Sequence, residues 1–386
     1  MAGESFAAKL NDLLPKIKER REEIEEGRRM PKDLVAEMAA TGLWRQAFPK
    51  ARGGEGASIA DSMRVIEKVA AVDGSAGWIA MICGGGADIA PKMSEEGFKE
   101  VFSDPSAPTA AAIPPKGVAV PVDGGFKFSG TWPFASGVTH VDWVAAGCVI
   151  LYDGQPRMTP MGFPEMVWGY MPTTEIEILD TWYVNGLKGT GSNDFTGKDV
   201  FVPAHRTFHM FDPTNWTLPN DPAGLTEIAG FASLVASVGL GIARGAIDEL
   251  VELAGGKMPT MSMTSLAAKP TTQIEVARLE AKLGGARAFL YDAIEDFWDT
   301  ILTGEKVSPR QNALARLAAS EAARVAASVA HRVSTIAGGT SLYLKSPIQR
   351  MQRDADAVTH HFVLSPPVLE DAGRVLLGMD PTSPVF

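Results

Sequence analysis

The spacing of apolar residues along the chain changes at two points. Up to about residue 105, apolar residues recur every three or four positions, in segments 9–27, 33–43, 61–72 and 75–82. Such spacing places them on one face of a helix. Between about residues 106 and 215 the segments are rich in Val, Phe and Trp and are interrupted by Gly and Pro, and VDGGFKF is typical of a hairpin with an Asp-Gly turn. We therefore expect an N-terminal helical domain over 1–105 and a small antiparallel β domain over 106–215.

Helical spacing returns after residue 216 and continues to the C-terminus. Four segments rich in Ala and Leu follow one another, 225–256, 273–304, 312–339 and 347–364. Helices of this length favour an antiparallel four-helix bundle over residues 216–386. The pattern as a whole predicts an α+β fold of three parts.

Composition and charge exclude several classes of protein. The chain is 45% apolar and 21% charged, as in ordinary globular proteins, and its net charge of −10 argues against a nucleic-acid partner. Its apolar stretches are interrupted before the roughly 20 residues that a membrane span needs, and no secretory signal is evident. Cys83 and Cys148 form no CxxC motif. We expect a cytoplasmic protein with no membrane partner.

Two segments of the β domain carry candidate binding residues. GTWPFASG sets Trp132, Phe134 and Ser136 at alternate positions, so on a strand they would share one face. That face could be a wall for a flat ligand or simply part of the sheet core. GLKGTGS offers the hydroxyls of Thr190 and Ser192 between glycines, although loops between strands often have this composition.

The tail RDADAVTHHF holds two adjacent histidines, His360 and His361. Such a pair can transfer protons, bind a metal or simply pack. Adjacent residues on a helix point about 100° apart, which suits chelation poorly, and the chain has no HExxH motif. We therefore expect no metal site. A dinucleotide-binding GxGxxG and a GxSxG nucleophile motif are also absent from the sequence.

The order of these segments resembles the acyl-CoA dehydrogenase superfamily over nearly the whole chain. The resemblance rests on VAAVDGSAGWIA, FSGTWPFASG, TWYVNGLKGTGSND with VFVP, and IAGGTSLYLKSPIQRMQRDA. WPFASG and the histidine-bearing tail resemble the oxygenase components of two-component (group D) flavin-dependent aromatic monooxygenases. The resemblance implies a homotetramer formed through the bundle. It also implies reduced flavin, FADH2 or FMNH2, supplied by a separate NAD(P)H:flavin reductase and reacting with O2 to a C4a-hydroperoxide that hydroxylates an aromatic or heteroaromatic compound.

The resemblance also assigns roles to residues. In the dehydrogenases a glutamate follows the Arg-Asp-Ala segment, whereas here that place falls near Phe362 and no carboxylate occurs between Asp356 and Glu370. The imidazoles become the candidate acid and base, His361 ahead of His360 because their side chains should point to different faces. The alternatives are a dehydrogenase-like flavin oxidoreductase whose base lies elsewhere, and a flavin-free binding subunit.

Ser136 would be the partner of flavin N5, and Phe134 would stack on the ring. The remaining flavin contacts implied are Trp132, Ala135, Lys188, Thr190, Ser192, Gly338 and Gly339. Phenol-hydroxylating relatives tend to carry a histidine where this chain has Gly84–Gly86 and a serine near Ala110–Ala112. We therefore expect a neutral, indole-like substrate, or a nitrogen or sulfur compound. The dehydrogenases use an arginine near the start of the first bundle helix to hold the diphosphate of FAD, and this chain has none there. The identity of the flavin therefore stays open, with FAD favoured and FMN close behind.

Overall fold

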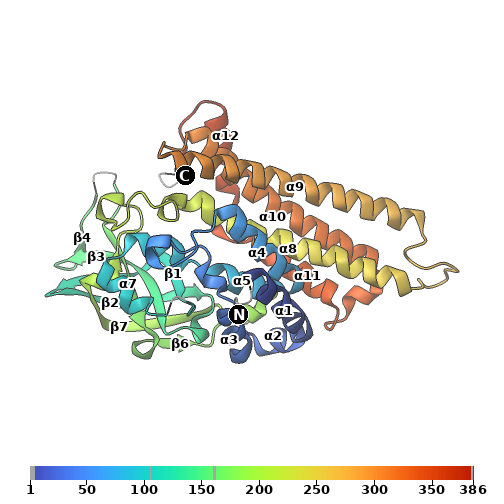
Figure 1. Cartoon of the computed structure of the whole chain (residues 1–386), viewed down its shortest axis with the longest axis horizontal. Helices are drawn as coiled ribbons and strands as arrows, with labels where there is room; N and C mark the ends of the chain where they lie inside the picture. The colour runs from blue at the N-terminus through green and yellow to red at the C-terminus, as the bar shows by residue number, and fades with distance from the viewer. Residues whose placement is uncertain (1–4, 105, 160–161, 384–385) are drawn as a thin grey trace.

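The computed structural model describes residues 5–104, 106–159, 162–383 and 386. Figure 1 shows three parts: a sheet at one end, a long helical bundle at the other, and N-terminal helices lying against both. The predicted architecture is confirmed. The N-terminal helices are α1 (Phe6–Glu19), α2 (Arg21–Gly27), α3 (Lys32–Ala40), α4 (Ile59–Val72), α5 (Gly74–Ile82), α6 (Gly86–Ile89) and α7 (Glu95–Val101).

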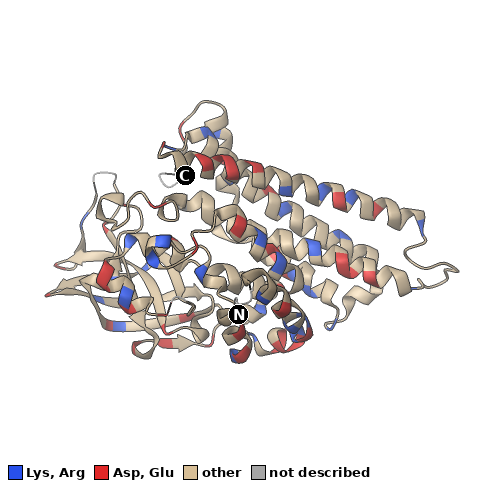
Figure 2. Ribbon diagram, viewed as in Figure 1, with Lys and Arg blue, Asp and Glu red and all other residues tan. Residues whose placement is uncertain are grey.

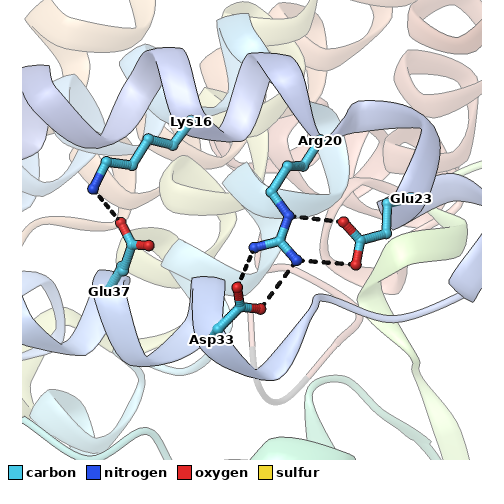
Figure 3. A network of polar contacts seen from close by, with 5 residues as sticks. All are labelled: Lys16, Arg20, Glu23, Asp33 and Glu37. Atoms are coloured by element: carbon cyan, nitrogen blue, oxygen red, sulfur yellow. Dashed lines mark hydrogen bonds and ion pairs between the residues drawn. The ribbon is translucent and has the colours of Figure 1, made fainter.

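A network of ion pairs joins the first helices at the surface (Figure 3). Arg20, between α1 and α2, donates to both oxygens of Glu23 and of Asp33, at 2.6 to 3.0 Å. Lys16 pairs with Glu37 at 2.5 Å. Because these groups are exposed, the pairs orient α1 against α3 more than they stabilise the fold. The buried leucines and isoleucines of α1 and α2 supply the packing.

The central domain is one twisted sheet with the strand order β6-β7-β2-β1-β3-β5-β8, and β4 pairs with β3. Its strands are β1 (Ala110–Val122), β2 (Gly125–Ala135), β3 (Trp143–Tyr152), β4 (Gln155–Pro156), β5 (Met166–Pro172), β6 (Glu177–Leu179), β7 (Asn193–Pro203) and β8 (Thr207–Phe208). The predicted hairpin is confirmed, since Val122 pairs with Gly125 across the Asp-Gly turn. The sheet is mainly antiparallel, as expected, and β1 with β3 is its one parallel pair among the described strands.

The C-terminal part is a bundle of α8 (Glu227–Gly256), α9 (Pro270–Thr303), α10 (Pro309–Ala337) and α11 (Pro347–Thr359), followed by the short α12 (Pro366–Leu376). Within the described chain, α8 from Ile228 is long and apolar enough to cross a membrane, but 78% of its most apolar window is buried. The sequence, in which Gly and charged residues interrupt the apolar stretches, does not predict a span there. Burial of this kind is typical of the central helix of a bundle. The predicted last helix is shorter than expected, because α11 ends at Thr359, before the histidine pair.

Helix α5 lies where the three parts meet. Residues 74 to 81 are all buried, as expected of a helix that is apolar on every side. Asp73 caps its first turn by accepting from the Ala76 amide at 2.9 Å. A Cβ at Gly74 would lie 2.9 Å from Asp354 Oδ2, so this position needs a glycine for α5 to approach α11. Figure 2 shows that acidic and basic residues are interspersed over the N-terminal helices and the bundle.

Candidate active site

A row of buried hydroxyl groups lies where the sheet meets α5. The indole Nε1 of Trp78 donates to Ser136 Oγ at 3.0 Å. Ser136 Oγ lies 2.6 Å from Ser192 Oγ, which lies 2.7 Å from Thr190 Oγ1. Thr190 Oγ1 donates to the Leu187 carbonyl at 2.8 Å. The structure thus brings together the three hydroxyls that the sequence singled out.

Two irregular segments place these hydroxyls. Ser136 follows β2, whose pairing with β7 shifts between Trp132 and Ala135. Thr190 ends the 3-10 turn η6 (Lys188–Thr190), which begins after Leu187 in the left-handed region, at φ 54°. A Cβ at Gly189 would lie 2.1 Å from Ile24 Cγ2, so the turn can pack against α2 only with a glycine there.

His361 lies on the other side of Trp78. The ring centroids of Trp78 and His361 are 5.7 Å apart, and Phe231 of α8 meets the imidazole edge-on at 5.4 Å. Burial among these rings lowers the pKa of His361 to about 4, so the imidazole is neutral at pH 7 and able to accept a proton. Its Nδ1 accepts from the Val363 amide at 3.4 Å, too long a contact to hold the ring in one tautomer.

The two adjacent histidines are separated by the end of α11. His360 caps the helix, its side chain is 77% exposed, and its Nε2 lies 3.7 Å from Asp356. His361 begins the 3-10 turn η11 (Phe362–Leu364) and turns inward. The prediction that the two side chains point to different sides holds. Its reason was wrong, because they do not belong to one continuous helix.

The expectation that Trp132, Phe134 and Ser136 share one face is wrong. Phe134 has a left-handed backbone, at φ 62°, which interrupts the alternation of the strand. Trp132 is fully buried, stacks on Phe195 at 5.1 Å and donates to the Gly147 carbonyl at 2.8 Å. With its ring fully buried against Phe195 and its only polar hydrogen bound to the Gly147 carbonyl, Trp132 is not favoured by the structure as a flavin contact.

Phe134 is 68% exposed and meets Trp182 edge-on at 6.2 Å. Its neighbour Ala135 is buried at the end of β2. Lys188, on η6, forms an ion pair with Glu25 at 3.1 Å. It also lines a charged cleft of about 550 Å³ together with Arg28 and Tyr183. Phe134 thus offers an exposed aromatic ring, whereas Lys188 lines a charged cleft that does not include Phe134.

Gly338 and Gly339 are not brought to this site within the chain. They begin the turn η10 (Gly338–Leu342) before α11, whereas His361 follows its other end. The 13 residues of α11 span about 20 Å at 1.5 Å per residue. Gly338 lies beside Lys257 at the end of α8, whereas His361 contacts Phe231 near the start of that helix, so the two glycines lie at the opposite end of the bundle from the imidazole.

The sequence reasoning missed Trp78 and Phe231. The signal for Trp78 was its place in GSAGWIAMI, a helix with no polar face, which indicates a central position. Nothing near Phe231 in the sequence marks it, because its contact with His361 joins positions 130 residues apart. Among the described residues, no group of three or more His, Cys, Asp or Glu could hold a metal ion.

A dehydrogenase-like oxidoreductase with a displaced base would need a carboxylate beside the reacting edge of the flavin. Asp354 is buried on α11, and burial together with the nearby Asp73 raises its pKa to about 7. Its Oδ1, however, accepts from the Leu187 amide at 2.6 Å, at the far end of the hydroxyl row from Trp78. The geometry does not favour this reading.

The buried hydroxyls and the exposed aromatic ring beside them suit a flavin, which has a polar edge and a flat conjugated face. Residues 6–100 match the acyl-CoA dehydrogenase N-terminal domain family, and residues 233–366 match the corresponding C-terminal domain family. The solved 3-HSA hydroxylase from Rhodococcus sp. RHA1 superposes with a TM-score of 0.90 at 27% identity, and each chain is fully covered. The chain belongs to the acyl-CoA dehydrogenase superfamily.

Relatives narrow the class further. The chain is 34% identical to the indole-3-acetate monooxygenase of Pseudomonas putida, over 98% of this chain and 95% of that protein. It is 28% identical to the oxygenase component of the FADH2-dependent resorcinol hydroxylase of Rhizobium sp., over 92% and 90%. Within the superfamily, the protein is the oxygenase component of a flavin-dependent monooxygenase.

Proposed function

We propose that the protein transfers one oxygen atom from O2 to an indole-like aromatic or heteroaromatic compound, using FADH2 delivered by a separate NAD(P)H:flavin reductase. The similarity to an indole-3-acetate monooxygenase supports the substrate class. The similarity to an FADH2-dependent component supports FAD, with FMN the second candidate. A reduced flavin bound here would supply the activated oxygen.

The observation that carries this proposal is the position of Trp78 between Ser136 and His361. A single indole donates to the hydroxyl and packs against the imidazole, so Ser136 and His361 lie on either side of Trp78. Ser136 would hold flavin N5, and the exposed ring of Phe134 would stack on the flavin. His361, neutral at pH 7, would accept the proton that leaves the substrate.

Two features of the chain support a substrate without an ionisable phenol. Gly84–Gly86, directly after α5, and Ala110–Ala112, at the start of β1, carry no polar side chain. These positions cannot help to remove a phenolic proton. An indole ring is nucleophilic without losing a proton first, so it needs no such help.

Assembly and location complete the proposal. We propose a homotetramer formed through the bundle, in which Gly338 and Gly339 contact flavin bound to another subunit, since within one chain they lie far from His361. We place the protein in the cytoplasm. The free thiols of Cys83 and Cys148 support this location, because oxidising compartments favour disulfides.

The test separates oxygen transfer from flavin binding. His361→Ala should lower the rate of product formation by about 10²- to 10⁴-fold, the usual contribution of an acid or base, while the Kd for reduced flavin stays nearly constant. His360→Ala is the matched control, because its side chain is exposed. Rates would be measured with a flavin reductase, on indole-like compounds and on simple phenols.

The outcomes that contradict the proposal differ. An unchanged coupled rate in His361→Ala removes the role of the imidazole. A preference for simple phenols removes the substrate class. If neither reduced FAD nor reduced FMN binds in an anaerobic titration, the chain is a binding subunit that has kept the fold.

A further inference from the structure

The direction of every hydrogen bond in the hydroxyl row is fixed by its two ends. At one end the indole nitrogen of Trp78 can only donate, and at the other the carbonyl of Leu187 can only accept. Each hydroxyl between them has one hydrogen. Thr190 Oγ1 must donate its hydrogen to the Leu187 carbonyl. Ser192 therefore donates to Thr190, and Ser136 donates to Ser192. No other arrangement forms all the bonds.

The Leu187 end is firmly held. Its carbonyl also accepts from Trp182 Nε1 at 3.1 Å and from the Thr190 amide at 3.2 Å. Its amide donates to Asp354 of α11 at 2.6 Å. These contacts hold the carbonyl in place as an acceptor, and hydrogen bonds in such a chain polarise one another in the same direction.

The consequence concerns what Ser136 can offer a ligand. A serine oxygen has one hydrogen and two lone pairs. The hydrogen points to Ser192, and Trp78 occupies one lone pair. One lone pair is left, so Ser136 acts toward a ligand only as an acceptor. Reversing this direction would leave Thr190 Oγ1 facing the carbonyl at 2.8 Å without a hydrogen between them.

The two redox states of a flavin differ at this point. N5 of the reduced ring carries a hydrogen and donates, whereas N5 of the oxidised ring has only a lone pair. We propose that the row anchored at Leu187 makes Ser136 a selector for reduced flavin, with Thr190 and Ser192 as positioning residues that set its direction. This inference rests on the proposed function, because it takes Ser136 as the partner of N5.

The test compares the Kd values for oxidised and reduced FAD in anaerobic titrations. In Thr190→Val, Ser192 loses its acceptor and turns its hydrogen to Ser136, which can then donate to oxidised N5. The ratio of the two Kd values, oxidised over reduced, should fall about tenfold, the effect of one hydrogen bond in a buried site. The midpoint potential of bound flavin should fall with it, by about 30 mV for a two-electron couple.

Two further variants keep the result interpretable. Thr190→Ser retains the hydroxyl and should retain the wild-type ratio. Ser233→Ala removes a buried hydroxyl that bonds only within α8, to the Ala229 carbonyl at 2.9 Å, and controls for the loss of any buried hydroxyl. Circular dichroism would confirm that each variant is folded, and Ser192→Ala replaces Thr190→Val if the valine variant is not.

The failures of the two proposals are distinct. If the wild type binds neither redox state, the proposed function fails. If the wild type binds reduced FAD more tightly than oxidised FAD, and the ratio stays the same in Thr190→Val and Ser192→Ala, the direction of the row does not select the redox state. An equal fall of the ratio in Ser233→Ala would overturn the inference as well.

Discussion

Asp354 offers a test of the electrostatics behind the site through the stability of the fold. Its carboxyl is buried between α5 and α11, near Asp73 and Glu25, and these surroundings raise its pKa from 3.8 to about 7 despite the nearby Arg353. Between these values the folded protein holds a proton that the unfolded chain has lost. The free energy of unfolding therefore contains a contribution that decreases as the pH rises from about 4 to 7 and is lost above that.

Asp354→Asn removes this titration but keeps an oxygen that can accept from the Leu187 amide. Between pH 5 and pH 7 the penalty in the wild type grows by about 1.4 kcal/mol per pH unit, about 3 kcal/mol in all. The asparagine variant should thus gain about that much relative to the wild type when measured at pH 8 instead of pH 5. Any cost of the amide that does not depend on pH cancels in this difference.

Urea unfolding at the two pH values, followed by circular dichroism, would measure the effect. His361 and His140, whose pKa values burial lowers to about 4, change stability in the opposite direction, but they are present in both proteins and cancel. Asp356→Asn is the control, because that carboxylate is on the same helix and is exposed. The reasoning would be refuted if Asp354→Asn changed stability equally at pH 5 and pH 8.

Four further results are expected. Trp132→Phe should lower the free energy of unfolding by about 1 to 3 kcal/mol, through the lost buried hydrogen bond and the lost volume, with little change in flavin affinity. Phe134→Ala should weaken flavin binding in a titration and leave the free energy of unfolding nearly unchanged. If the two variants weaken flavin binding equally, Trp132 is a flavin contact after all. His360→Ala should leave the steady-state rate within about twofold, and a larger loss would show that the exposed imidazole takes part. Gly189→Ala should weaken both folding and flavin binding, because its Cβ would overlap Ile24, which a thermal melt and the same titration would check.

The sequence predicted those features that depend on local spacing. The helices and the Asp-Gly hairpin follow from periodicity and turn residues within a few positions. The family resemblance added their order in space. Together they predict Ser136, Thr190, Ser192 and His361 as site residues.

The remaining features arise from contacts between distant segments. The left-handed backbone at Phe134 has no sequence signal, because such a conformation normally favours glycine or asparagine. The parallel pairing of β1 with β3 arises because β2 pairs on the other side of β1, and residues 136–142 carry the chain past β1 to β3. Trp78 joins Ser136 to His361 only because α5 is enclosed by all three parts of the molecule. No spacing rule for one segment can show this.

The imidazole and the hydroxyl row have separate supports. The row is built from the sheet and the η6 turn, whereas His361 is carried on a short turn beyond the last regular residue of α11. A residue in such a turn can be exchanged without disturbing the helix before it. A substitution at this position therefore need not disturb the hydroxyl row, so the side chain beside Trp78 and the row can change independently of each other.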